Sequence, residues 1–124
     1  MIYWQAMKTY EDLEVYKRAY RLGIEIYKFT FTLPKDLQYD LADDIRRAAR
    51  SIISNIAEGY GRRKSNKDTS SYLKISLGSC YEVNFNLKFM KDLDLIVDEK
   101  YEYFSGEYTI CAKQLNRLIA SLTK

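Results

Sequence analysis

The chain has 124 residues, of which 47% are hydrophobic and 30% are charged, and it carries a net charge of +3. These values are typical of a single globular domain rather than of a disordered chain. The absence of histidine removes the commonest general base and the commonest metal ligand of proteins. The sequence also contains no P-loop, dinucleotide motif or Ser-His-Asp set. We therefore expect a protein that is not an enzyme and that needs no metal or other cofactor.

Hydropathy and cysteine usage are those expected of a cytoplasmic protein. No segment approaches the ~20 apolar residues that span a bilayer, and the first residues lack the pattern of a secretory signal. We therefore expect no membrane partner. Cys80 and Cys111 stand far apart, without C-x-x-C spacing, on apolar helix faces. We interpret them as small buried core residues, with a disulfide or a reactive thiol as the alternative.

A first helix is predicted over residues 10–31, after a leader of residues 1–9 that is expected to be poorly ordered. Thr9 and Asp12 have the spacing of a capping box at the start of this helix. The helix is expected to stop before Pro34, because a proline disfavours the helical conformation in the residue ahead of it.

A second helix is predicted over residues 36–60. It is expected to end at Gly59 and Gly61, because glycine tolerates the left-handed conformation of a helix C-cap. Residues 62–67 then form a polar connection to the third helix.

The third and fourth helices are predicted over residues 66–93 and 98–122, with Ser65 or Asn66 capping the third. The connections are short, so helices that follow one another in sequence should lie antiparallel. The sequence therefore predicts an all-α fold, in which residues 10–124 form one antiparallel up-and-down four-helix bundle.

Apolar residues on the second and fourth helices form single stripes that can face a bundle core. The stripe on the second helix is Leu37, Leu41, Ile45, Ala48, Ala49, Ile52 and Ile56, and the stripe on the fourth is Tyr101, Phe104, Tyr108, Cys111, Leu115, Leu118 and Leu122. The first and third helices are instead apolar around most of their circumference, which predicts burial on most sides. We therefore expect copies of the chain to associate, because large exposed apolar patches are rare on monomers. The alternative is a monomer with tyrosine hydroxyls at its rim.

Positive charge is concentrated between Arg46 and Lys67, where seven cations and one carboxylate, Glu58, give a local charge of +6. The candidate nucleic-acid-binding residues are Arg46, Arg47, Arg50, Arg62, Arg63, Lys64, Lys67 and Lys74. Converging cations bind phosphates, and Tyr60 and Tyr72 beside the connection offer rings on which bases can stack. The alternative is a solvated face with local ion pairs, because Asp43 and Glu58 lie four residues before Arg47 and Arg62, respectively.

Small and polar residues on the second and third helices suggest a contact between the two helices. The candidate structural polar clamp comprises Asn55, Glu58, Gly78, Ser79 and Glu82. A glycine in mid-helix costs about 1 kcal/mol relative to alanine, so we expect Gly78 to admit a neighbouring backbone. An active site built on Asn55, Glu58 and Glu82 is the less favoured alternative.

The chain resembles the bacterial four helix bundle protein family, also called 23S rRNA-intervening-sequence proteins, from about Thr9 to its C-terminus. The resemblance lies in Tyr10-Glu11-Asp12-Leu13-Glu14-Val15-Tyr16, Leu33-Pro34, Arg46-Arg47-Ala48-Ala49, Ser51-Ile52, Ser54-Asn55-Ile56-Ala57-Glu58-Gly59, Gly61-Arg62-Arg63 and Gly78-Ser79 with Glu82. The chain departs from the pattern at Ile53, where a proline is common, and at Ser76, where an alanine is common. The resemblance implies an up-and-down bundle that assembles as a homopentameric ring, and it implies no established activity.

A related protein, the accessory variability determinant of diversity-generating retroelements, is a basic pentamer that binds nucleic acid and a reverse transcriptase. Its basic positions correspond here to Arg46, Arg47, Arg50, Arg62 and Arg63. The expected partners are therefore other copies of the chain, RNA or DNA, and a reverse transcriptase or another nucleic-acid enzyme. The alternative is a protein-only structural scaffold, in which the cations pair with acidic residues such as those of Lys91–Tyr108 on a neighbouring copy.

Overall fold

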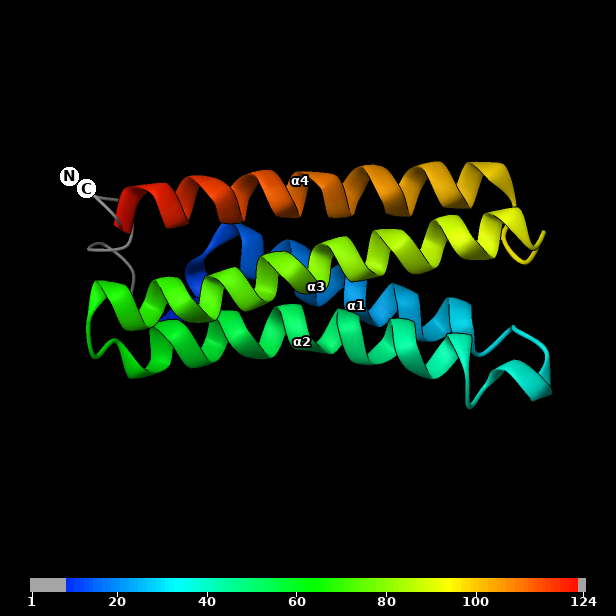
Figure 1. Ribbon diagram of the computed structural model, residues 1–124, viewed down its shortest axis with the longest axis horizontal. Coiled ribbons are helices and arrows are strands. Elements are labelled where there is room, and N and C mark those ends of the chain that lie inside the picture. The colour runs from blue at the N-terminus through cyan, green and yellow to red at the C-terminus, as the bar shows by residue number, and fades with distance from the viewer. Residues whose placement is uncertain (1–8, 123–124) are drawn as a thin grey trace.

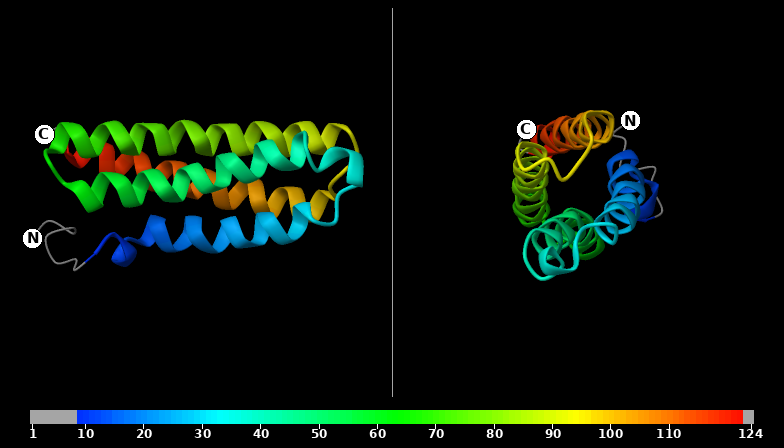
Figure 2. Two further views of the ribbon diagram at one scale, coloured as in Figure 1. Left: turned by 90° about the horizontal axis from the view of Figure 1, so that it is seen from below. Right: turned by 90° about the vertical axis from the view of Figure 1, so that its right-hand side faces the viewer.

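The computed structural model describes residues 9–122, which form a bundle of four antiparallel helices (Figure 1). The helices are α1 (Glu14–Thr30), α2 (Leu41–Arg62), α3 (Asn66–Asp92) and α4 (Asp98–Leu122), and the short 3-10 helices η2 (Tyr10–Asp12) and η3 (Lys35–Leu37) precede α1 and α2. Viewed end-on, the four helices follow one another around the bundle, so that α1 and α3 lie diagonally opposite (Figure 2). The predicted all-α up-and-down architecture is confirmed.

The capping box lies where it was expected, but it caps η2 rather than α1. The Thr9 hydroxyl accepts a hydrogen bond from the Glu11 amide at 3.0 Å, and the Asp12 carboxylate accepts one from the Thr9 amide at 3.2 Å. Leu13 then adopts an extended conformation with a side chain only 1% exposed, so α1 begins at Glu14. Burial of Leu13 thus breaks the predicted continuous helix. The rest of the expected leader, residues 1–8, lies outside the described residues.

The second helix differs from its prediction at both ends. It begins at Leu41 rather than Asp36, because residues Lys35–Leu37 form η3. It also continues through Gly59 and Gly61 to Arg62, so the expected glycine C-cap is wrong.

The residue with the left-handed conformation is Arg63, with a φ of 43°, and its amide donates to the Gly59 carbonyl at 3.2 Å. Gly59 instead allows α2 and α3 to pack closely, because a Cβ at this position would lie 2.9 Å from Tyr72 Cβ and 3.3 Å from the Thr69 carbonyl oxygen.

The third and fourth helices begin as predicted. The Ser65 hydroxyl accepts a hydrogen bond from the Asp68 amide at 3.0 Å and caps α3. The turn between α3 and α4 contains Asp94 with a φ of 60°.

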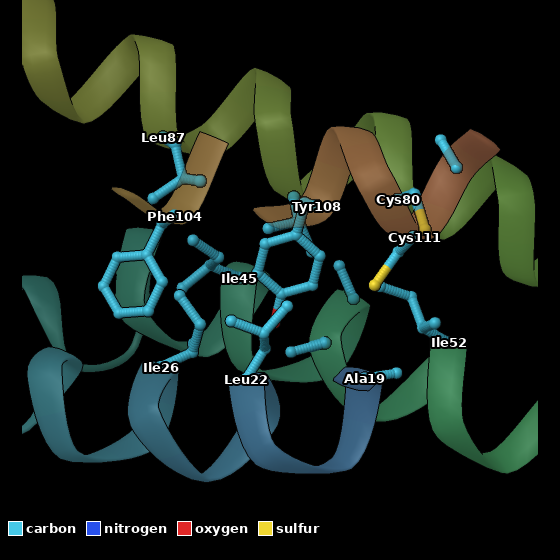
Figure 3. Packing of buried hydrophobic residues seen from close by; sticks show 14 of the residues in the cluster. Ala19, Leu22, Ile26, Ile45, Ile52, Cys80, Leu87, Phe104, Tyr108 and Cys111 are labelled. Atoms are coloured by element: carbon cyan, nitrogen blue, oxygen red, sulfur yellow. The ribbon is translucent and has the colours of Figure 1, made fainter. Parts of the chain in front are cut away.

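The core lies along the axis of the bundle and contains side chains from all four helices (Figure 3). Most of the predicted stripe positions are fully buried, while Leu37, Leu41, Tyr101 and Leu118 are half-buried at its edges. Cys80 and Cys111 are buried and free, as small core residues should be.

Several large apolar side chains lie outside this core. Tyr20 and Ile24 of α1 are 52% and 46% exposed, and Phe85 and Phe89 of α3 are 64% and 46% exposed. The rings of Phe85 and Phe89 stack on each other with centroids 6.0 Å apart. The single bundle therefore leaves apolar surface on the two helices for which the sequence predicted it.

Candidate nucleic-acid interface

Seven of the eight candidate cations fall into two groups along the bundle, and Lys74 lies apart on α3. Arg46, Arg47 and Arg50 lie in the N-terminal half of α2, whereas Arg62, Arg63, Lys64 and Lys67 lie where α2 turns into α3. Arg46 and Arg62 are 16 residues apart in one helix, which corresponds to about 24 Å at ~1.5 Å per residue. The cations therefore do not converge on a single point.

Arg46 is a structural residue of the bundle. It is half-buried, its Nε donates to Thr30 Oγ1 at 2.8 Å, and its Nη2 donates to Gln38 Oε1. Its guanidinium carbon lies 4.7 Å from the centre of the Phe31 ring. Gln38 Nε2 in turn donates to the carbonyls of Thr30 and Leu33. Arg46 thus ties the C-terminal end of α1 to α2, which leaves little of its guanidinium for an external phosphate.

The charge of Arg47 is paired with carboxylates, whereas that of Arg50 is not. Arg47 pairs with Asp43 at 3.3 Å and with Asp44 at 3.4 Å, so the pairing expected from the four-residue spacing is present. Arg50 is exposed and forms no hydrogen bond or ion pair within residues 9–122; it borders a groove between α1 and α2.

The remaining cations cluster at the end of the bundle where α2 meets α3 (Figure 1). We call Arg62, Arg63, Lys64 and Lys67 the turn patch; all four side chains are exposed. Lys74 lies two turns further along α3 and is also exposed.

Arg62 is the member of the turn patch whose side chain forms a hydrogen bond and an ion pair within the described residues. Its Nη1 donates to the Tyr72 hydroxyl at 2.6 Å, and its Nε lies 4.0 Å from a carboxylate oxygen of Asp68. Arg62 therefore pairs across the turn with Asp68 rather than along α2 with Glu58. The side chains of Lys64 and Lys67 form no hydrogen bond or ion pair with any residue that the structure describes, and they remain available to a partner.

The two tyrosines beside the turn are less accessible than predicted. Tyr60 is only 4% exposed, with Arg63 5.8 Å from its ring centre, and burial raises its pKa to about 12. Tyr72 is half-buried beneath Arg62. Stacking of a base on Tyr60 is therefore excluded in this conformation, because the ring is buried.

A polar clamp between α2 and α3 is present, but its centre is Ser51, which was not among the predicted clamp residues. Ser79 Oγ of α3 donates to Ser51 Oγ of α2 at 2.8 Å, whereas Asn55 Nδ2 donates to the Ser51 carbonyl at 2.9 Å within α2. Ser76 Oγ donates to the Ile52 carbonyl at 2.9 Å. The departure from alanine at Ser76 thus adds a buried hydrogen bond between the helices.

The clamp prediction is wrong for Glu58, Gly78 and Glu82. All three are exposed, and no atom of the described chain lies within 4 Å of a Cβ built on Gly78. The close approach of α2 and α3 occurs at Gly59 instead. Of the residues in the alternative active site, Glu58 and Glu82 are exposed and Asn55 is half-buried.

A polar network between α1 and α4 could not be inferred from the sequence. Glu107 Oε1 accepts from Arg18 Nη1 at 2.8 Å and from Arg21 Nη2 at 2.7 Å. Tyr103 donates to Glu25 at 2.7 Å. The hydrogen bond from Arg21 holds the pKa of the Glu107 carboxyl below its usual range. Glu107 belongs to the acidic segment, so this carboxylate is neutralised within its own chain.

Other reactive groups of the described chain are buried or dispersed. Burial raises the pKa of both thiols, that of Cys111 to about 12. Residues 9–122 contain no group of three or more histidine, cysteine or acidic side chains placed to hold a metal ion. None of the helices in this part of the chain is long and apolar enough to cross a membrane.

The fold and the turn patch define a helical-bundle protein with a basic end. Residues 11–117 match the model of the 23S rRNA-intervening sequence protein family, and the chain belongs to that family. A crystal structure of a protein of unknown function from the S23 ribosomal protein family of Bacteroides thetaiotaomicron is similar, with a TM-score of 0.78 and 23% identity. The match covers 86% of this chain and 95% of that one and shows a shared fold. No curated protein matches the sequence.

Proposed function

We propose that the protein is a non-enzymatic oligomer of helical bundles that binds the phosphates of RNA or DNA through its turn patch. The observation that carries this proposal is the exposed run of Arg62, Arg63, Lys64 and Lys67. Asp68, the carboxylate nearest to it in sequence, already faces Arg62. Exposed cations that are not neutralised gain most from phosphate contacts, since each contact releases a condensed counterion.

Self-association supports this role by repeating the turn patch. The exposed aromatic side chains on α1 and α3 favour a contact between copies, because water-exposed apolar area of this kind is rarely kept by a monomer. Copies arranged around an axis add their positive fields at one end of the assembly. The ring of five copies implied by the family resemblance is the arrangement that we propose.

The proposed biological role is that of an adaptor. The family description refers to 23S ribosomal RNA, which makes structured RNA the first ligand to test. An enzyme that processes nucleic acid, such as a reverse transcriptase, is the kind of protein that such an adaptor would deliver to its template.

One set of observations favours a protein-only structural scaffold as the second candidate. Three of the eight candidate cations already have partners in the chain: Arg46 with Thr30 and Gln38, Arg47 with Asp43 and Asp44, and Arg62 with Asp68 and Tyr72. If the remaining cations also pair with acidic residues of neighbouring copies, no phosphate site is left.

Binding to structured RNA and duplex DNA, measured by fluorescence anisotropy over a range of salt, separates the two candidates. The test variant is Arg63→Gln with Lys64→Gln and Lys67→Gln. The matched control removes the same charge from Lys17, Lys28 and Lys113, which are exposed on α1 and α4. The test variant should bind at least tenfold more weakly, with the slope of log K against log salt reduced by about 2.

The control should retain most of the affinity. An equal loss in both triple variants would show that only total charge matters. Unchanged affinity in the test variant, or no binding by the wild-type protein, would favour the scaffold.

A further inference from the structure

A groove between α1 and α2 runs along the outside of the bundle and is lined almost entirely by apolar and aromatic groups. Its volume is about 560 Å³. On α1 its main walls are Tyr16, Tyr20, Ile24 and Tyr27, spaced three or four residues apart on one face. Of the residues that line it, Arg50 alone is charged.

The outer face of α3 has the complementary form. Ile75, Phe85 and Phe89 are 53%, 64% and 46% exposed. At 100° per residue they share an arc of about 80° with Gly78 and Glu82. We call these five residues the α3 ridge, and Glu82 is its one charged member.

Gly78 is the unexplained residue of the ridge. A glycine inside a helix costs about 1 kcal/mol relative to alanine. Nothing in the described chain lies within 4 Å of a Cβ at this position, so packing inside the protomer does not require it. Gly78 lies one turn before Glu82 and leaves open space beside the carboxylate, in which a planar guanidinium can lie against the backbone.

We propose that the α3 ridge of one copy docks into the α1–α2 groove of the next copy, with Glu82 of the ridge paired with Arg50 of the groove. The inference rests on the oligomer of the proposed function and names the surfaces that build it. Each surface carries one unpaired charge among apolar groups, and the two charges are opposite. Burial of either charge without its partner would be strongly unfavourable, which sets the register of the contact.

The dimensions of the two surfaces agree. From Tyr16 to Tyr27 the groove follows about 16 Å of α1, and from Ile75 to Phe89 the ridge follows about 21 Å of α3, at ~1.5 Å per residue.

Ridge and groove also lie on different sides of the bundle, because α3 is diagonally opposite α1 (Figure 2). Each copy can therefore use both surfaces at once, which produces a head-to-tail ring or chain rather than a two-fold dimer. In this arrangement Arg50 is an assembly residue and not a phosphate contact.

Charge exchange tests the pairing. The association of wild type, Arg50→Glu, Glu82→Arg and the double variant is compared by sedimentation velocity, with helix content checked by circular dichroism. Both residues are exposed, so each variant should fold. Each single variant should associate at least tenfold more weakly, and the double variant should recover most of the lost affinity. Failure of the double variant to recover would overturn the pairing.

Blocking one surface at a time tests the docking. Phe85→Glu blocks the ridge and leaves the groove intact, and Ile24→Glu does the reverse. Each variant should be a monomer alone, and an equimolar mixture should form a 1:1 heterodimer through the one intact ridge and the one intact groove. Val97→Glu, at a residue 69% exposed and outside both surfaces, should assemble as wild type does.

The outcomes separate this inference from the proposed function. Wild-type protein that is monomeric at about 50 µM would overturn both this inference and the oligomer of the proposed function. Phosphate binding is tested separately, by the turn-patch variants. Oligomers that survive both Phe85→Glu and Ile24→Glu would overturn the inference alone, as would a mixture that remains monomeric.

Discussion

Gly59→Ala should destabilise the protein, whereas the same substitution at Gly106 should stabilise it. Both glycines lie inside helices, but their surroundings differ. A Cβ on Gly59 would lie 2.9 Å from Tyr72 Cβ and 3.3 Å from the Thr69 carbonyl oxygen. Neither atom is at the end of a flexible side chain, so α2 and α3 must move apart. A Cβ on Gly106 meets nothing within 4 Å in the described chain.

The magnitude follows from three contributions. Overpacking at such a contact costs about 1–3 kcal/mol. Separation of the helices also weakens the hydrogen bond from Thr69 Oγ1 to the Gly59 carbonyl, 3.1 Å long, which contributes about 1 kcal/mol. Alanine gains about 1 kcal/mol in helix propensity. Gly59→Ala should therefore lose about 1–3 kcal/mol, and Gly106→Ala should gain up to about 1 kcal/mol.

Urea denaturation followed by circular dichroism measures both variants at a fixed protein concentration, because the proposed self-association would make stability depend on concentration. In thermal scans the two variants should differ by about 10 °C, at ~4 °C per kcal/mol for a chain of this length. Equal or greater stability of Gly59→Ala, with the expected gain at Gly106, would refute the close contact of α2 and α3.

Two further predictions concern the interior and the α1–α4 network. Glu107→Gln should lose about 1–2 kcal/mol at pH 7, while Glu102→Gln, at an exposed control site, should change stability by less than about 0.5 kcal/mol. The folded pKa of Glu107 is lowered, so its contribution is present above the ordinary carboxyl pKa and is lost as pH falls through the folded value. The loss caused by Glu107→Gln should therefore shrink as the pH is lowered, and a loss that does not shrink with acid would contradict this. Tyr108→Phe removes a buried hydroxyl with no hydrogen-bond partner in the described residues, so urea unfolding should show unchanged or slightly higher stability; a loss above about 1 kcal/mol would contradict the assignment.

The positions of the helices followed from local patterns. The stripes on α2 and α4, the Ser65 cap and the barrier at Pro34 each depend on residues within a few positions of one another, and the structure confirms them. The errors at helix ends have a different origin. Leu13 interrupts the first helix because its side chain enters the core.

The candidate cations were recognised by type, but their roles depended on neighbours from other helices. Arg46 resembles Arg47 and Arg50 in sequence, yet two of its N–H groups donate to Thr30 and Gln38. Tyr60 could be placed beside the turn from the sequence, but its burial could not be predicted. The sequence indicated a basic protein, and the structure distinguished which cations face solvent.

Gly59 and Gly78 show most simply what the sequence determines and what only the tertiary structure decides. The all-helical fold, the four segments and the surplus of apolar surface could be inferred from the chain alone, because periodicity and capping act over one or two helical turns. The sequence suggested Gly78 as the point of close contact, whereas the bundle has that contact at Gly59 and leaves Gly78 open. The rotation and separation of packed helices depend on all the side chains between them at once, so residues distant in sequence decide which glycine is enclosed.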